Sequence, residues 1–303
     1  MGTMTDGSCI FVTDLHGSMA RYRQLIRLIE QETPSAVFVG GDILPSILRS
    51  SDLESFAEKF IDDFLALELF TLRSRLGKRY PSIFLILGND DPRAAERDIL
   101  KEEYANLWVY AHNRRLRYGE FDVYGYSYVP PSPFFLKDWE RYDVSQSIDP
   151  GCVSPEEGMY SVEVDRHAVK YATIRDDLEN LVAGHDLSHS ILLFHAPPYQ
   201  TALDRAALDG RMVDHVPMDV HVGSIAIRRL IEQRRPFLTL HGHVHESPRL
   251  TGRWRDRIGD THMLAAGHDG PELAVVRFRL DDLESATREL LPVDLPRSPD
   301  RVG

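Results

Sequence analysis

The chain contains the stretch SCIFVTDLH at residues 8–16, in which a short apolar run ends in one carboxylate and one imidazole. The run has the length of a buried strand, and an amphipathic pattern with apolar residues at three- and four-residue steps follows it over 18–32. The same alternation predicts strands at 36–40 and 82–87 and helices at 51–76 and 92–104. Successive units of this kind indicate an α/β fold in which helices cover a sheet.

A second sheet is expected to begin at 114–124, where apolar and polar residues alternate around a Gly-Glu turn, as in an antiparallel hairpin. The proline-rich segment 127–158 shows no sustained period, and we expect it to cap a site. We predict a single domain over 1–291 with this insertion, and a disordered tail at 292–303. Further helices are expected at 169–183 and 223–234, and further strands at 107–111, 190–195, 237–241, 249–254, 261–266 and 272–280.

The composition narrows the class of protein. The 303 residues are 43% hydrophobic and 27% charged, which excludes a collagenous or largely disordered chain. No apolar run approaches the roughly 18 residues of a membrane span. The net charge of −12 disfavours nucleic acid as a partner. The first residues carry neither a basic nor an apolar stretch, and the two cysteines form no disulfide framework, so we expect a cytoplasmic protein.

Five short motifs rich in metal-ligand residue types follow predicted strands. They are Asp14-Leu15-His16, Gly40-Gly41-Asp42, Gly88-Asn89-Asp90-Asp91, His195 and Gly242-His243-Val244-His245. Each motif alone is more typical of an ordinary turn. In an open α/β sheet, however, ligands bind beyond the carboxyl ends of the strands, where all five motifs lie. Residues two apart in an extended segment also point the same way, so Asp14 and His16 are expected to face one cation.

With these motifs in this order, the chain resembles the calcineurin-like metallophosphoesterases over about residues 8–270. The stretches around His195-Ala196-Pro197-Pro198-Tyr199 and His241-Gly242-His243 are similar to the subgroup described as Icc-related phosphoesterases. The resemblance implies a four-layer α/β/β/α sandwich of two mixed sheets flanked by helices, with a dinuclear metal centre at the sheet edge. It implies that one ion takes Asp14, His16 and His245, that the second takes Asn89, His195 and His243, and that Asp42 bridges them.

Mixed carboxylate, amide and imidazole ligands suit two divalent transition-metal ions, of which Mn, Fe, Zn, Co and Ni all remain open. Such a pair would support attack of metal-bound hydroxide on a small phosphomonoester or phosphodiester. Two alternatives remain open as well. One is a nuclease, which needs a basic track that the charge balance does not show, and the other is a metal-binding interaction module whose catalysis has decayed. The sequence leaves the oligomeric state undecided.

The chain departs from the family pattern at Asp90, where many relatives carry a histidine that protonates the leaving oxygen. A carboxylate near two cations favours its ionised form and is a poor general acid at neutral pH. Either the leaving group takes its proton elsewhere, or Asp90 orients a metal-bound water or a ligand histidine. His241 has the same parity as His243, so an extended backbone would make it a candidate proton donor, although a buried core histidine is the more ordinary interpretation.

Three other histidines and one serine are candidates for a role in the site. His112 is expected to be structural. His215 and His221, near Asp214 and Asp219, either touch substrate or are solvated loop residues. Ser224 is expected to cap the helix at 223–234, whose first N–H groups could also bind a phosphate oxygen.

Overall fold

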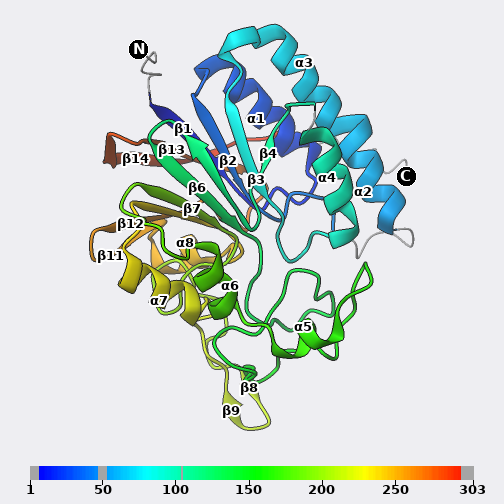
Figure 1. The fold of residues 1–303 in the computed structure, drawn as a ribbon, viewed down its shortest axis with the longest axis vertical. Coiled ribbons are helices and arrows are strands. Elements are labelled where there is room, and N and C mark those ends of the chain that lie inside the picture. The colour runs from blue at the N-terminus through cyan, green and yellow to red at the C-terminus, as the bar shows by residue number, and fades with distance from the viewer. Residues whose placement is uncertain (1–6, 47–52, 104, 295–303) are drawn as a thin grey trace, which may run out of the picture.

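The computed structural model describes residues 7–46, 53–103 and 105–294. Two six-stranded sheets form its centre, in the orders β14-β13-β1-β2-β3-β4 and β11-β12-β10-β7-β6-β5 (Figure 1). We call them the first and the second sheet. The strands of the first are β1 Ser8–Val12, β2 Ala36–Gly40, β3 Ser82–Ile86, β4 Val109–Tyr110, β13 Leu273–Arg279 and β14 Asp282–Leu291. Those of the second are β5 Arg114–Tyr118, β6 Phe121–Tyr126, β7 Ser190–Phe194, β10 Leu238–His241, β11 Arg255–Ile258 and β12 Thr261–Ala265.

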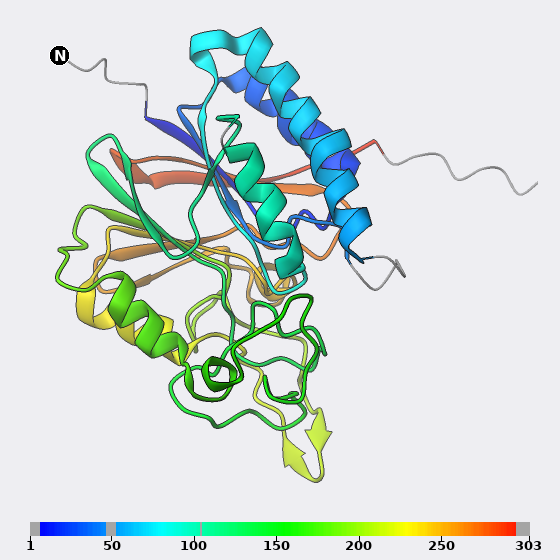
Figure 2. The same cartoon turned by 45° about the vertical axis from the view of Figure 1, so that its right-hand side comes forward.

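Helices cover the outer face of each sheet, which gives the predicted four layers (Figure 2). On the side of the first sheet lie α1 Met19–Glu32, α2 Leu53–Phe60, α3 Leu67–Leu76 and α4 Glu96–Glu103. The second sheet carries α6 Ile174–Leu181 and α7 Ile225–Arg234, and the connecting segments add α5 Arg166–Tyr171 and α8 Ser247–Thr251. The prediction of an α/β/β/α sandwich is confirmed. None of the helices in the described ranges has the length and apolarity needed to cross a bilayer.

The inner strands are apolar on both faces, because one face of each sheet packs against helices and its other face packs against the other sheet. In β1, Ile10 and Val12 belong to the cluster beneath the helices, whereas Cys9 and Phe11 belong to the cluster between the sheets. Phe38 of β2 is fully buried in that inter-sheet cluster, where it stacks on Phe84 at a centroid distance of 5.4 Å. This continuous burial explains why the strands read as unbroken apolar runs in the sequence.

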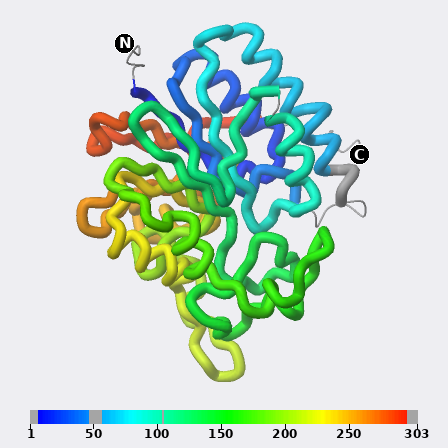
Figure 3. The backbone as a smooth tube through the Cα atoms, viewed as in Figure 1, coloured from blue at the N-terminus to red at the C-terminus, as the bar shows by residue number. Residues whose placement is uncertain are grey.

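The central strands run in parallel: β1, β2, β3 and β4 in the first sheet, and β6, β7, β10 and β12 in the second. The parallel strand β4 is also an outer strand of the first sheet, and antiparallel strands occupy its other side, β13 and β14, and both outer positions of the second sheet, β5 and β11. The carboxyl ends of parallel strands within one sheet necessarily meet at one edge. The loops that follow β1, β2 and β3 therefore gather at one edge of the first sheet, and those that follow β7 and β10 gather at one edge of the second. The two edges are adjacent, because the ring of His195, after β7, is hydrogen-bonded to the carbonyl of Gly40, at the end of β2. Figure 3 traces the backbone through both sheets.

The helix predicted at 18–32 is confirmed as α1. Ser18 caps it by accepting the N–H of Arg21 at 3.4 Å, and Thr33 ends it in a left-handed conformation with φ 44°. The helix predicted at 51–76 is interrupted by a π-helical segment at Ile61–Ala66, and its first two positions lie outside the described residues.

Three predictions of local structure were wrong. The helix expected at 169–183 is two helices, because Thr173 takes an extended conformation and caps α6. The strand expected at 249–254 is the helix α8, which has a proline in its first turn and ends at Gly252 with φ 71°. The antiparallel strand β14 was not predicted, since its sequence is polar at most positions.

Residues 127–158 form no helix or regular strand within the described chain. A buried ion pair between Lys137 and Glu140 organises the segment, and Ser132 donates to the same carboxylate. Figures 1 and 2 place α5 and the hairpin of β8 Met212–Val213 and β9 Val216–Pro217 on the side of the molecule away from α1 and α3. Capping by 127–158 remains a prediction, and most of the predicted tail, 295–303, lies outside the described residues.

Candidate metal centre

The loops after β1 and β2 are hydrogen-bonded to each other. The N–H of Asp14 donates to the carbonyl of Gly41 at 3.0 Å, and the N–H of His16 donates to the carbonyl of Asp42 at 2.8 Å. Asp14, His16 and Asp42 all have left-handed backbones, with φ of 56°, 46° and 49°. Few non-glycine residues adopt this conformation, although Asp and His do so more readily than most. The extended geometry expected for Asp14 and His16 is therefore wrong, and tight turns bring their side chains together.

Gly88, which precedes Asn89, and Gly242, which precedes His243, allow side chains of the site to approach the backbone closely. A Cβ atom at Gly88 would lie 2.4 Å from Asp42 Oδ1 and 2.6 Å from His195 Nε2. A Cβ atom at Gly242 would lie 3.0 Å from Asp14 Oδ2. Any side chain at these two positions would displace groups of the site, which accounts for the glycines in the motifs.

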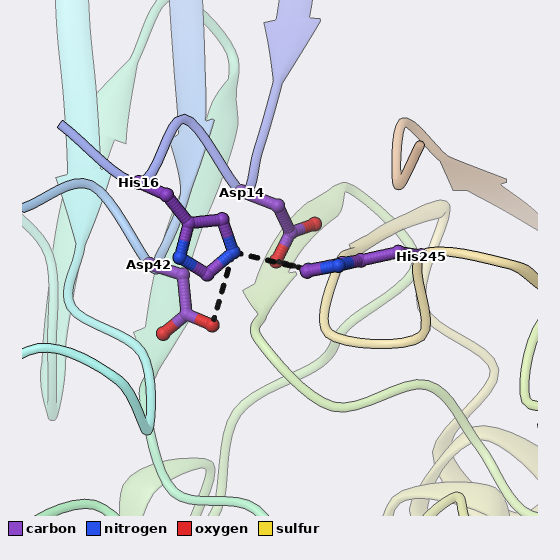
Figure 4. Close-up of side chains that lie close together, drawn as sticks. All are labelled: Asp14, His16, Asp42 and His245. Carbon is purple, nitrogen blue, oxygen red and sulfur yellow. Dashed lines mark hydrogen bonds and ion pairs between the residues drawn. The ribbon is translucent and has the colours of Figure 1, made fainter. Parts of the chain in front are cut away.

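Four of the predicted ligands form one tight cluster. Donor atoms of Asp14, His16, Asp42 and His245 all lie within 4.8 Å of one another, and the side chains point toward a common space (Figure 4). The Nε2 atoms of His16 and His245 are 3.2 Å apart, and His245 Nε2 lies 3.2 Å from Asp14 Oδ1. Two imidazoles and two carboxylates this close together can share one cation.

The other three predicted ligands lie beside this cluster. His195 Nε2 is 3.1 Å from Asn89 Oδ1 and 3.4 Å from Asp42 Oδ2. Its Nδ1 donates to the carbonyl of Gly40 at 2.8 Å, which directs Nε2 toward the site. The ring of His243 packs against that of His195, with centroids 5.2 Å apart. The fold thus brings all seven side chains into one neighbourhood.

The site concentrates buried negative charge. The side chains of Asp14 and Asp42 are almost fully buried, and Asp14 Oδ2 has no hydrogen-bond partner in the described part of the chain. Burial lowers the pKa of His16 and of His195, but the neighbouring carboxylates outweigh it and raise both pKa values to about 9. Since buried charges are stable when they are paired or bind metals, the donor set fits divalent cations.

Asp90 contacts a ligand histidine. Its Oδ2 lies 3.1 Å from His16 Nδ1, and its Oδ1 accepts the hydroxyl of Ser46 at 3.2 Å. Its backbone N–H donates to Asp42 Oδ1 at 2.8 Å. This geometry supports the alternative in which Asp90 orients a ligand histidine, because holding Nδ1 leaves His16 Nε2 directed at the cluster.

His241 has the geometry of a core histidine, which corrects the interpretation of this residue as a proton donor. Its ring is fully buried, Nδ1 donates to the carbonyl of Ala196 at 2.9 Å, and Nε2 lies 2.7 Å from Thr239 Oγ1. Burial lowers its pKa to about 4. The parity argument failed because the strand ends at His241 and His243 is left-handed, with φ 70°.

Two residues that support the site were missed in the sequence. The buried carboxylate of Asp91 accepts the backbone N–H groups of Ile43, Leu44 and Gly88 at 3.1, 2.7 and 2.9 Å. Arg21, which has the pattern of an exposed helix residue, donates to the carbonyl of Asp14 at 2.8 Å. No periodic signal marks either role. Asp91 depends on the loop after β2, 47 and 48 positions away, and Arg21 has a further partner, the carbonyl of Pro271 at 3.4 Å, that lies 250 positions away.

The start of α7 already holds an anionic group. Ser224 Oγ accepts the N–H of Ile227 at 3.1 Å, which confirms the predicted cap. The carboxylate of Asp143 accepts the N–H of Ile225 at 2.6 Å and the hydroxyl of Ser224, also at 2.6 Å. The alternative in which a phosphate binds these N–H groups is therefore wrong. His112 is buried, as expected for a structural residue, and accepts the N–H of Ser127 at 3.0 Å.

Comparison with known proteins agrees with this geometry. Residues 8–247 match the family model for calcineurin-like phosphoesterases. The chain belongs to that family. A curated relative from Methanocaldococcus jannaschii, the uncharacterized protein MJ1162, is 38% identical over 78 residues, which is 25% of this chain and 30% of that protein.

Two solved structures share the calcineurin-like phosphoesterase fold. One superposes with a TM-score of 0.60 at 17% identity and covers 95% of this chain and all of that chain (100%). The other, TT1561 of Thermus thermophilus, superposes with a TM-score of 0.55 at 13% identity and covers 94% of this chain and 99% of that chain. At these identities the likeness shows the fold alone.

Proposed function

We propose that this calcineurin-like phosphoesterase hydrolyses a small phosphomonoester or phosphodiester with the help of two divalent cations. The observation that carries the proposal is the cluster of four donor groups around Asp14 and Asp42, two buried carboxylates, one of which has an oxygen without a protein partner in the described residues. A cluster that only stabilised the fold would satisfy its buried polar atoms within the protein.

In this proposal Asp14, His16 and His245 hold one cation, and Asn89, His195 and His243 hold the other. Asp42 Oδ2 lies 3.4 Å from His195 Nε2 and 3.9 Å from His16 Nε2, which suits a carboxylate shared between the two sets. When bound, such a pair supplies Lewis acidity that lowers the pKa of water and offsets phosphoryl charge.

Other groups of the chain hold the proposed metal ligands in position. Asp90 holds the ring of His16, Arg21 holds the carbonyl of Asp14, and the carbonyl of Gly40 holds the ring of His195. The cysteines do not offer an alternative thiolate nucleophile. Burial raises the pKa of Cys9 to about 12 and that of Cys152 to about 11, so both stay protonated at neutral pH.

The surface charge supports a small substrate over nucleic acid. The arginines that alternate on β5 have acidic partners: Arg115 and Arg117 both pair with Asp122, at 2.8 and 2.9 Å. Arg257, on β11, pairs with Glu284 at 2.8 Å. Neutralised arginines do not make the basic track that a nuclease needs.

The test combines metal analysis with hydrolysis. Metal-free protein is loaded with Mn²⁺, the bound ions per chain are measured by elemental analysis, and the same sample is assayed on 4-nitrophenyl phosphate, bis(4-nitrophenyl) phosphate, a cyclic nucleotide and single-stranded DNA. We expect two ions per chain and turnover of at least one small ester. Two bound ions without turnover of any ester would make the chain a metal-binding module, and preference for the DNA would make it a nuclease.

A further inference from the structure

A second acid-base pair lies outside the metal centre. Asp204 is fully buried, and its Oδ1 lies 2.8 Å from Nδ1 of His221. The same carboxylate accepts the backbone N–H groups of Gln200 at 2.8 Å, Thr201 at 2.9 Å and Gly223 at 3.3 Å. Four contacts fix the carboxylate, so it in turn fixes the orientation of the imidazole.

The other ring nitrogen of His221 is not used by the protein in the described residues. The side chain of His221 is 29% exposed, and no hydrogen bond within those residues uses Nε2. Tyr199 packs edge-on against the ring at a centroid distance of 6.1 Å, and Asp219 Oδ1 accepts the backbone N–H of His221 at 2.8 Å. The sequence placed His221 near Asp219, but its imidazole is paired with Asp204.

The loop that carries His221 is attached to two ligand-bearing loops. Next to His195, the N–H of Ser224 donates to the carbonyl of Pro197 at 2.8 Å. Next to His245, the N–H of Arg205 donates to Ser247 Oγ at 3.0 Å, and Arg205 forms an antiparallel bridge with His221. His221 is therefore held beside the segments that present His195 and His245, at the edge of the sheet where the metal centre lies.

The side chains of the metal centre described so far include no group that can protonate the leaving oxygen. A poor leaving group such as an alkoxide needs a proton as its bond to phosphorus breaks. Asp90 contacts His16, and both ring nitrogens of His241 are occupied within the core. A histidine whose Nδ1 is held by a buried carboxylate, while Nε2 makes no hydrogen bond within the described residues, is an arrangement that serves proton transfer in other hydrolases.

We propose that His221 is the proton donor to the leaving oxygen and that Asp204 is its positioning residue, an assignment that rests on the proposed hydrolase function. The oxygen of a water molecule forms a bond to phosphorus, and that water loses one proton to solvent. The phosphorus bond to the leaving oxygen breaks, and its electron pair stays on that oxygen. The oxygen takes the proton from His221 Nε2, and the neutral imidazole, still holding its Nδ1 proton toward Asp204, regains a proton from solvent.

The kinetic test uses His221→Asn, because the asparagine amide can still donate to Asp204 but cannot release a proton. His215→Asn is the control, since His215 is exposed in the turn of the neighbouring hairpin and its left-handed backbone, with φ 68°, tolerates asparagine. Wild type and variants are assayed on 4-nitrophenyl phosphate and methyl phosphate, or on the corresponding diesters if diesters are turned over. We expect His221→Asn to lower kcat/KM about 100-fold for the methyl ester and less than about threefold for the aryl ester.

The outcomes separate the two proposals. Equal losses on both esters, no loss on either, or a wild-type enzyme that cleaves only the aryl ester would overturn the assignment of His221 and leave the hydrolase function standing. A wild-type protein that cleaves no ester would overturn both.

A second measurement does not depend on activity, and its deciding result comes from the wild-type protein. Nitrogen-15 NMR of metal-free wild-type protein reports which ring nitrogen of neutral His221 carries the proton. We expect the Nδ1 tautomer, with a shift toward the Nε2 tautomer in Asp204→Asn. An Nε2 tautomer in wild type would overturn the assignment, because Asp204 would then not prepare the ring to donate from Nε2.

Discussion

The edges of the two sheets contribute different chemistry to the metal centre. The first sheet supplies Asp14, His16, Asp42 and Asn89, and so both carboxylates of the set. The second sheet supplies only imidazoles, from His195, His243 and His245. Hydrogen bonds that join the halves include His195 Nδ1 to the carbonyl of Gly40 at 2.8 Å and the N–H of His243 to Asp14 Oδ1 at 3.1 Å. The carboxylates of the set therefore come from the first sheet alone, whereas its imidazoles come from both sheets.

The largest effect is expected from Asp42→Asn, which removes charge from the first-sheet half. Because this carboxylate lies between both sets of donors, we expect loss of at least one bound ion and a fall in kcat/KM of about 10³-fold or more. Elemental analysis and an aryl-ester assay measure the two effects. Asp63→Asn, at an exposed helix position, is the control and should change neither. Full metal content and activity in Asp42→Asn would show that the charge of the first sheet is dispensable.

Leu238→Ala tests the packing that holds the halves together. Leu238 is fully buried in the cluster between the sheets, at the end of β10 far from the site. Removing its side chain leaves a cavity and should lower the free energy of unfolding by about 3 kcal/mol, measured by urea denaturation. Activity per folded molecule should stay near that of wild type. A large loss of activity in the folded variant would mean that small changes in sheet packing reach the metal ligands.

His245→Ala removes one imidazole from the second-sheet half. We expect the metal affinity to fall about 100-fold, less than for the shared carboxylate, because the remaining donors of the cluster keep their positions. Titration of metal-free protein with Mn²⁺, followed by calorimetry, measures the change. His189→Ala, at an exposed turn residue just before β7, should bind the metal as wild type does. An effect as large as that of Asp42→Asn would remove the distinction between the two halves.

The smallest effect is expected from Asp90→Ala, which removes only the support of His16. Loss of such a hydrogen bond should weaken metal binding about tenfold. Asp90→Asn keeps an acceptor oxygen for His16 Nδ1 and should lose less. The same calorimetric titration distinguishes these expectations. If Asp90→Asn instead abolished turnover while binding the metal normally, Asp90 would act on the substrate and not on His16.

The sequence was a sound guide wherever short apolar runs determined the outcome. The ends of β1, β2, β3, β7 and β10 follow from those runs, and the parallel arrangement then brings the five motifs to one side of the molecule. The extended backbone expected at Asp14 and His16 was wrong, because both residues are left-handed. An extended segment and a tight left-handed turn can have the same residue types at the same spacing. Only the hydrogen bonds between the loops distinguish the two conformations.

Other features depend on partners that are distant in the chain. Arg21 lies on the polar side of an amphipathic pattern, yet it also donates to the carbonyl of Pro271, 250 positions away. His221 could be interpreted as a loop residue until Asp204, 17 positions away, was found beside it. The edge strand β14 has charged residues on its exposed face and therefore lacks the apolar signal of a buried strand.

The carboxylate of Asp91 has a consequence for how this site can change. It accepts N–H groups from the loop after β2 and from the loop after β3 at the same time. The backbone around Asp42 and the backbone around Asn89 are thereby tied into a single piece. A substitution that shifts the backbone of one loop will therefore carry the other with it, so we expect it to disturb the ligands of both cations at once.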